Sequence, residues 1–249
     1  MARDGQGTDI LAYWPLWALL RLWFQGYMGV RVTGAERVPA RGPVLVCGNH
    51  RSVWDPILVG ALVRRRAWYI AKMELFRYPM LGPILRMVGA FPVRRHAADR
   101  TALRRSLAVL DRQGALVLFP EGTRSRTGDL GKGAPGAALL ALRTGAAVVP
   151  VGIRGGYGFR GGLEVRFGDP IRLRAPAGRL RSRELSAIVD SQIMGEIARL
   201  AGTVTPGPEV TERAVQGGAC AAGECRPKLV EHPAVEPPGA AGGRRPGCP

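Results

Sequence analysis

Short apolar runs alternate with amphipathic segments along most of the chain. In the segment 100–110, for example, Leu103, Leu107 and Leu110 recur at helical spacing. The pattern predicts strands at 43–47, 68–71, 90–93, 115–119, 147–153 and 163–167, and helices at 80–87, 100–110, 136–143 and 183–200, with another helix beginning at Asp55-Pro56. Strands that alternate with helices are typical of a parallel, buried sheet. We therefore predict a single α/β domain with a mostly parallel central sheet flanked by helices.

The first 30 residues have a different pattern. The segment 10–30 is rich in large apolar and aromatic residues, but Pro15, Arg21 and Gln25 interrupt it. A helix that spans a membrane normally needs about 20 uninterrupted apolar residues. Three of the five tryptophans fall within ten positions here, and aromatic rings suit the level of the lipid headgroups. The sequence therefore predicts an N-terminal membrane-interfacial helix within residues 1–30, with an amphipathic helix packed on the domain as the alternative.

The end of the chain changes composition once more. From about Gly202 onward, Gly, Pro and Ala dominate and large apolar residues are few. Such a segment cannot bury enough apolar surface to order its backbone, so we expect residues 203–249 to form a disordered C-terminal tail. Three of the four cysteines lie in this tail without a close Cys-x-x-Cys pair, which favours neither a disulfide framework nor a zinc site. The folded domain is accordingly expected over residues 31–202.

The chain is strongly basic, with 36 Lys and Arg against 19 Asp and Glu, a net charge of +17. This balance indicates an anionic partner, which can be nucleic acid, anionic lipid headgroups or a phosphorylated substrate. No helix-turn-helix, zinc-finger or RNA-binding signature is present, so nucleic acid is disfavoured. The run Arg64-Arg65-Arg66 fits either a contact with anionic headgroups or coenzyme A phosphates, or a solvated helix end.

Candidate chemistry begins with His50 and Asp55. His50 follows a predicted strand and a Gly48-Asn49 turn, so it lies where open α/β sheets place their sites. Asp55 stands directly before Pro56, which also matches a helix N-cap. A carboxylate that holds one imidazole nitrogen fixes the tautomer and makes the other nitrogen a better general base.

A second polar run, Phe119-Pro120-Glu121-Gly122-Thr123-Arg124-Ser125-Arg126, also follows a predicted strand. Its glycine lets a ligand approach the backbone, its hydroxyls can donate hydrogen bonds, and its guanidinium groups can hold a phosphate. The run is therefore a candidate anion site, although a polar β-turn with solvated arginines has the same composition.

Together these runs resemble the glycerolipid acyltransferase family, specifically the 1-acylglycerol-3-phosphate (lysophosphatidic acid) acyltransferases. The resemblance covers residues 31–174. It rests on four blocks in the family's order: Asn49-His50-x-x-x-x-Asp55, Gly89-Ala90-Phe91-Pro92-Val93-Arg94-Arg95, Phe119-Pro120-Glu121-Gly122-Thr123-Arg124-Ser125 and Val148-Val149-Pro150-Val151-Gly152-Ile153. In the second block the family often has an acidic residue where this chain has Arg94, which leaves the particular acceptor open.

The resemblance implies an O-acyltransferase that needs no cofactor and no metal. His50 would be the general base and Asp55 would orient it. Glu121, Gly122, Thr123 and Arg124 would bind the acceptor's glycerol phosphate with Arg95, and Pro150 would shape the pocket. The implied partners are acyl-CoA or acyl-carrier protein, lysophosphatidic acid or a related lipid, and an anionic membrane surface.

Residues 31–202 would then be the acyltransferase domain. We expect it to act in phospholipid biosynthesis at the cytoplasmic face of the cell membrane, as a peripheral or monotopic protein. The alternatives are an acyltransferase for another lipid acceptor, a thioester hydrolase, and a basic membrane-binding or nucleic-acid-binding module without catalysis.

Overall fold

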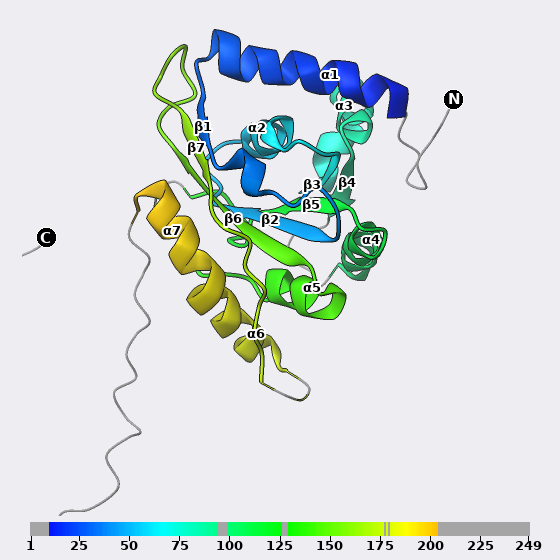
Figure 1. Ribbon diagram of the computed structural model, residues 1–249. Helices are drawn as coiled ribbons and strands as arrows, with labels where there is room; N and C mark the ends of the chain where they lie inside the picture. Colours follow the sequence, from blue (N-terminus) through cyan, green and yellow to red (C-terminus); the bar gives the residue numbers. More distant parts are fainter. Residues whose placement is uncertain (1–9, 94–98, 126–128, 177, 179, 204–249) are drawn as a thin grey trace, which may run out of the picture. The chain divides into compact units, whose positions relative to one another are not determined.

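A seven-stranded sheet forms the centre of the fold, with strand order β1-β7-β6-β2-β5-β3-β4 (Figure 1). The computed structural model describes residues 10–93, 99–125, 129–176, 178 and 180–203. The strands are β1 Arg31–Thr33, β2 Val44–Gly48, β3 Ala67–Lys72, β4 Ala90–Val93, β5 Ala115–Leu118, β6 Ala147–Arg154 and β7 Glu164–Phe167. Neighbouring strands are parallel except β6 and β7, which are antiparallel. The predicted α/β class with a mostly parallel sheet is confirmed.

Helices cover both faces of the sheet (Figure 1). One layer comprises α1 Ile10–Leu22, the π-helical turn η1 Trp23–Tyr27, α2 Asp55–Leu62, the 3-10 turn η3 Met73–Arg77 and α3 Leu81–Met87. The other comprises α4 Arg100–Asp111, α5 Gly136–Thr144, α6 Ser182–Val189, the π-helical turn η4 Asp190–Met194 and α7 Gly195–Ala201. Successive residues of β2 alternate between the layers: Val44 and Val46 pack in the first core, Leu45 and Cys47 in the second. Burial on both faces explains why β2 is continuously apolar.

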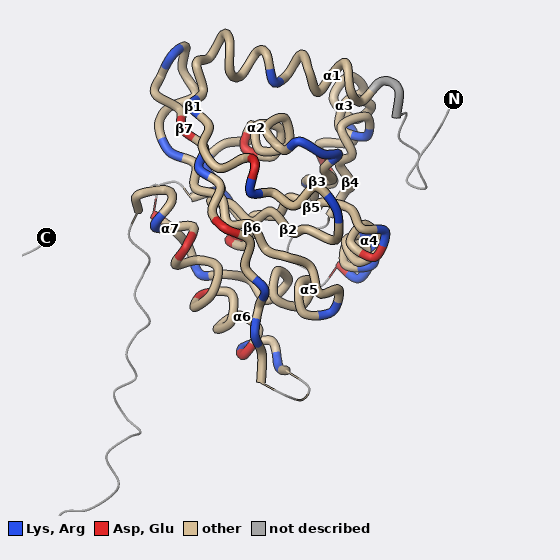
Figure 2. The backbone as a smooth tube through the Cα atoms, viewed as in Figure 1, with Lys and Arg blue, Asp and Glu red and all other residues tan. Residues whose placement is uncertain are grey.

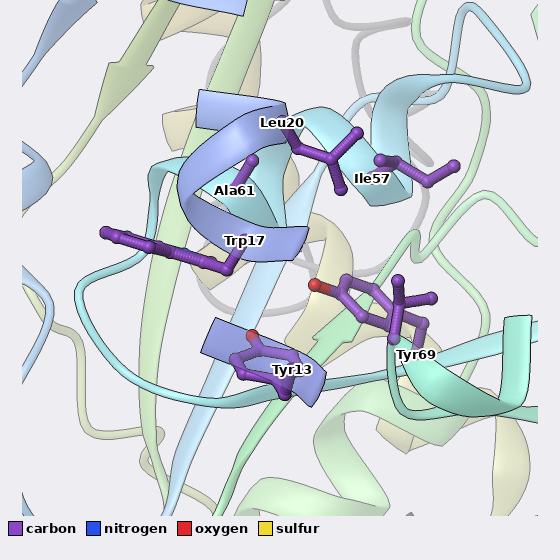
Figure 3. Close-up of a pocket in the computed structure, with 7 residues that line it drawn as sticks. Tyr13, Trp17, Leu20, Ile57, Ala61 and Tyr69 are labelled. Carbon is purple, nitrogen blue, oxygen red and sulfur yellow. The ribbon is translucent and has the colours of Figure 1, made fainter. Parts of the chain in front are cut away.

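Helix α1 packs on α2 through polar as well as apolar groups. Trp17 Nε1 donates to the carbonyl oxygens of Gly60 and Val63, 3.2 Å away in each case, at the end of α2. Last-turn carbonyls have no partner within their own helix, so these bonds cap α2. Side chains of α1, α2 and β3, among them Tyr13 and Tyr69, enclose a cavity of only about 10 Å³ (Figure 3). The helix is therefore closely fitted to the domain.

The outer side of α1 is apolar. Leu19 is 63% exposed and Leu22 is 69% exposed. Arg21 is the single charged residue within Ile10–Leu22, and it is the one blue segment in an otherwise tan stretch of α1 beyond its first turn in Figure 2. The described part of the chain contains no helix with the length and hydropathy that a membrane crossing requires.

Three features differ from the predicted elements. The short strand β1 and the 3-10 turn η2 Ala35–Arg37 lie in a region for which the apolar pattern predicts no strand or helix. The helix expected over 183–200 runs from Ser182 to Ala201, but η4 interrupts its α-helical hydrogen bonding. The predicted tail at 203–249 lies outside the described residues from position 204 onward, as do the three cysteines within it.

Candidate active site

Asn49 fixes the point at which the chain leaves β2. Its Nδ2 donates to the carbonyl oxygen of Ile153 at 2.9 Å, and its Oδ1 accepts from the Ile153 amide at 2.7 Å. The side chain thus continues the pairing between β2 and β6 beyond the last strand residue. Asn49 is buried, so both of its polar atoms need partners of this kind. The sequence placed Asn49 in a motif without giving it a role.

His50 and Asp55 form a buried pair in the loop between β2 and α2. His50 Nδ1 lies 2.8 Å from Asp55 Oδ2. The aspartate is 0% exposed and the histidine 7% exposed, and the imidazole stacks on the ring of Phe119 with centroids 4.4 Å apart. Because the carboxylate accepts a hydrogen bond from Nδ1, it favours the tautomer in which Nε2 is unprotonated. Nε2 is then the nitrogen available for proton transfer.

The Asp55 carboxylate does not serve as the N-cap that the sequence also allowed. Helix α2 begins at Asp55 itself, with Trp54 as its N-cap residue. Asp55 Oδ2 instead accepts from the backbone amides of Arg51 and Ser52, both at 2.6 Å. The loop therefore folds around this carboxylate, which holds both the backbone and the imidazole in place.

Glu121 connects this loop to the second motif. Its Oε1 accepts from the His50 backbone amide at 2.9 Å, and its Oε2 accepts from the Gly131 amide at 3.1 Å. The amide of Ser125 donates to the His50 carbonyl oxygen at 2.9 Å. Because both carboxylate oxygens already bind backbone amides, Glu121 is placed to hold the two loops together. A carboxylate would also repel an acceptor phosphate, so we assign Glu121 a positioning role in place of direct phosphate binding.

Gly122, Thr123 and Arg124 form an exposed turn beside His50. The Gly122 amide donates to the Phe119 carbonyl oxygen at 3.0 Å, and Gly122 has a φ of 66°, which favours glycine. A Cβ added to Gly122 would meet no atom within 4 Å. These three residues line the same cleft as His50, so the structure brings the two motifs to one site.

The cleft has a volume of about 1560 Å³, larger than most pockets for small ligands. Its lining is chemically divided. The polar part includes His50, Thr123 and Arg124, whereas apolar walls come from both helical layers. The apolar lining residues include Val53, Ile57, Leu75, Leu85, Val88, Leu103, Leu139, Leu142 and Leu185. A ligand with a charged group and a long apolar chain matches this division.

The sequence also predicts Arg95 and Pro150 as site residues. Arg95 lies outside the described residues. Pro150 is buried within β6 and packs against Gly168. A Cβ added to Gly168 would lie 2.8 Å from the Cγ of Pro150. Pro150 is not among the described residues that line the cleft. It pairs with Cys47, which faces the α5–α7 layer, whereas His50 stacks on Phe119 in the opposite core. The role of Pro150 in shaping the pocket stays a prediction.

The sequence of this chain is similar to a family model and to several known proteins. The sequence model of the family described as "Acyltransferase" matches residues 29–154, which contain the His50–Asp55 pair and the Glu121–Arg124 segment. The 1-acyl-sn-glycerol-3-phosphate acyltransferase of Borreliella burgdorferi is 31% identical over 134 residues, which are 53% of this chain and 53% of that protein. A chloroplastic 1-acyl-sn-glycerol-3-phosphate acyltransferase of Arabidopsis thaliana is 31% identical over 143 residues, 56% of this chain and 39% of that protein.

A solved structure is also similar. The 1-acyl-sn-glycerophosphate (LPA) acyltransferase PlsC of Thermotoga maritima superposes with a TM-score of 0.55 at 27% identity. The match covers 71% of this chain and 73% of that one. By sequence, in contrast, the chain spans about half of the length of the first relative and less of the second.

Proposed function

The chain belongs to the Acyltransferase family, and from this premise we propose that it transfers a fatty acyl group to the free hydroxyl of 1-acylglycerol-3-phosphate. The donor would be acyl-CoA or acyl-carrier protein, and the product phosphatidic acid, a step of phospholipid biosynthesis. The observation that carries the proposal is the 2.8 Å contact between His50 Nδ1 and Asp55 Oδ2 inside a cleft that also presents Arg124. The names of the two sequence relatives and of the similar structure support the choice of acceptor.

In the proposed reaction, His50 Nε2 takes the proton of the acceptor hydroxyl while the hydroxyl oxygen attacks the thioester carbonyl carbon. Asp55 stabilises the imidazolium that forms. The tetrahedral intermediate then collapses, the carbon–sulfur bond breaks, and the leaving thiolate takes the proton back from Nε2. The atoms balance without a metal, a cofactor or a covalent enzyme intermediate.

Binding of the acceptor would fall to the exposed turn beside His50. In this proposal Arg124 holds the phosphate through charge-assisted hydrogen bonds, with Thr123 as a hydroxyl donor and Gly122 leaving the backbone open. Arg95 remains a proposed phosphate ligand on the strength of the family resemblance. A fixed phosphate would place the hydroxyl beside Nε2, which converts binding energy into orientation.

The decisive experiment is an acceptor panel. Purified protein would be incubated with acyl-CoA or acyl-carrier protein and, separately, with 1-acylglycerol-3-phosphate, glycerol-3-phosphate, a lysophospholipid or no acceptor. We expect phosphatidic acid with the first acceptor, none from a His50→Ala variant, and wild-type rates from the matched control His232→Ala. If free fatty acid is released without an acceptor as fast as the thioester is consumed with 1-acylglycerol-3-phosphate, the protein is a thioester hydrolase and the proposal is contradicted.

We further propose that the protein works at the cytoplasmic face of the cell membrane as a peripheral or monotopic protein. Support comes from the exposed apolar residues of α1 and from the nearby ring contact between Trp23 and Trp54. Deleting residues 1–30 would be a poor test, because Phe24 and Met28 are buried in the core. A Leu19→Asp/Leu22→Asp variant should instead lose co-flotation with anionic vesicles. Ala187→Asp, an exposed position in the other helical layer, should not. Equal flotation of both variants would contradict an α1-mediated contact.

A further inference from the structure

Tyr157 lies in the loop between β6 and β7, three residues beyond the segment that matches the family. Its hydroxyl donates a hydrogen bond to Asp55 Oδ1, although 102 positions separate the two residues in the chain. The tyrosine ring packs, partly buried, against the core that also contains Phe119. A residue outside the four motifs thus contacts the carboxylate at the centre of the site.

The hydrogen bonds of Asp55 divide between its two oxygens. Oδ2 accepts from His50 Nδ1 and from two backbone amides, whereas among the described residues Oδ1 accepts from Tyr157. Asp55 is fully buried, so solvent cannot replace a hydrogen-bond donor that one of its oxygens loses. The Tyr157 hydroxyl therefore completes the hydrogen bonding of this carboxylate.

The loop that carries Tyr157 is held at several points. Arg51 Nη1 donates to the Gly155 carbonyl oxygen at 3.1 Å, and the Gly156 amide donates to Gly161 at 3.1 Å. Gly155 has a φ of 88°, and a Cβ at this position would lie 2.2 Å from the Gly162 carbonyl oxygen. Only glycine suits that turn, so the loop has a defined shape that directs Tyr157 toward Asp55.

We propose that Tyr157 is a positioning residue for acyl transfer, because it holds the Asp55 carboxylate in line with His50. The inference rests on the proposed function. Without that donor, Asp55 would have more freedom to turn, and the His50 imidazole that it holds would lose its fixed orientation toward the acceptor hydroxyl.

The charged and titratable groups around the pair support a specific role for this hydroxyl. They are the Arg51 side chain, bound to Gly155, the Glu121 carboxylate, bound to the His50 amide, and Arg124 at the cleft. Burial and the neighbouring Asp55 raise the pKa of Tyr157 above its ordinary value, so the phenol stays a donor throughout the neutral range. Tyr157→Phe would leave all these other groups in place while removing only the donor.

The kinetic test compares Tyr157→Phe with Tyr78→Phe, which alters an exposed tyrosine outside the cleft. For Tyr157→Phe we expect kcat to fall about tenfold, as the loss of one hydrogen bond to a charged group implies. KM for 1-acylglycerol-3-phosphate should change less than about twofold, because ground-state binding is intact. Tyr78→Phe should match the wild type in both kcat and KM. An unchanged kcat would overturn the inference, and so would an acceptor KM that rises as much as kcat falls.

A second measurement does not depend on activity. The chain has three histidines, so 13C labelling of histidine gives three imidazole signals, and His50→Ala identifies the one from His50. We expect the His50 signal, recorded at one neutral pH, to shift in Tyr157→Phe and to stay in place in Tyr78→Phe. If the acceptor panel yields no product while this signal shifts, the proposed function fails although the coupling exists. If the panel succeeds and this signal stays in place, the role of Tyr157 is refuted.

Discussion

The loop after β2 and the loop after β5 lie at the same edge of the sheet and line the same cleft, but they are built differently. In the first, Asn49, His50 and Asp55 are buried, and the Asn49 amide, His50 Nδ1 and the Asp55 carboxylate bind neighbouring side chains or backbone groups. In the second, Gly122, Thr123 and Arg124 are exposed to the cleft. A buried, hydrogen-bonded group keeps a fixed geometry, whereas an exposed one is free to meet a ligand.

Glu121 shows how the two loops depend on each other. It belongs to the second motif, yet one of its carboxylate oxygens binds the backbone of His50. Under the proposed function, the first loop would hold the catalytic pair and the tip of the second would bind the acceptor. Three substitutions examine that division, beginning with the largest expected effect.

Asp55→Asn should be the most damaging of the three. An amide that turns its NH2 group toward the Arg51 and Ser52 amides sets donor against donor, and in either orientation the negative charge beside His50 is lost. We expect kcat to fall about a hundredfold, within the range that general-base catalysis supplies. Steady-state assays at saturating acceptor measure this, and a kcat within twofold of the wild type would remove Asp55 from the chemistry.

Glu121→Gln tests whether Glu121, in the loop after β5, holds the loop after β2 in place. A glutamine cannot accept from both the His50 and Gly131 amides with oxygen atoms, so one contact is lost. We expect kcat to fall about tenfold with little change in the acceptor KM. Glu184→Gln is the matched control, because Glu184 also accepts from a backbone amide, that of Arg181, at the start of α6. A raised acceptor KM at constant kcat would indicate that Glu121 binds the acceptor and does not position His50.

Arg124→Ala should affect binding alone. Loss of one charge-assisted contact to a phosphate should raise the acceptor KM about tenfold and leave kcat nearly unchanged. Arg183→Ala, an exposed arginine on α6, controls for the loss of positive charge. Equal KM values for the two variants would place the acceptor phosphate elsewhere in the cleft.

The two regions also differ in how far sequence could define them. The position of His50 after a strand followed from a buried apolar run and a Gly-Asn turn, because parallel strands end at a common edge. The contact of Asp55 with Tyr157 had no sequence signal, since it depends on a glycine-rich loop over 100 positions away. The motif position of Pro150 likewise did not reveal which face of the sheet its side chain occupies.

Patterning predicted the long strands and missed small or context-dependent features. The three residues of β1 are too few for a recognisable period. The antiparallel direction of β7 follows from its hairpin with β6, which apolar spacing does not encode. The basic run Arg64-Arg65-Arg66 fits neither predicted role as a whole. Arg65 donates to the carbonyl oxygens of Pro39 and Gly42, and Arg66 lies over the rings of Tyr13 and Trp68.

The central claim is that His50 and Asp55 act as one unit in acyl transfer, and a double-mutant cycle on kcat tests it most directly. His50→Ala, Asp55→Ala and the double variant would be compared with the wild type, using 1-acylglycerol-3-phosphate and one thioester donor. Because Asp55 acts through His50, the double variant should be no slower than His50→Ala alone. Losses that multiply in the double variant would show that the two residues act independently and would contradict the account.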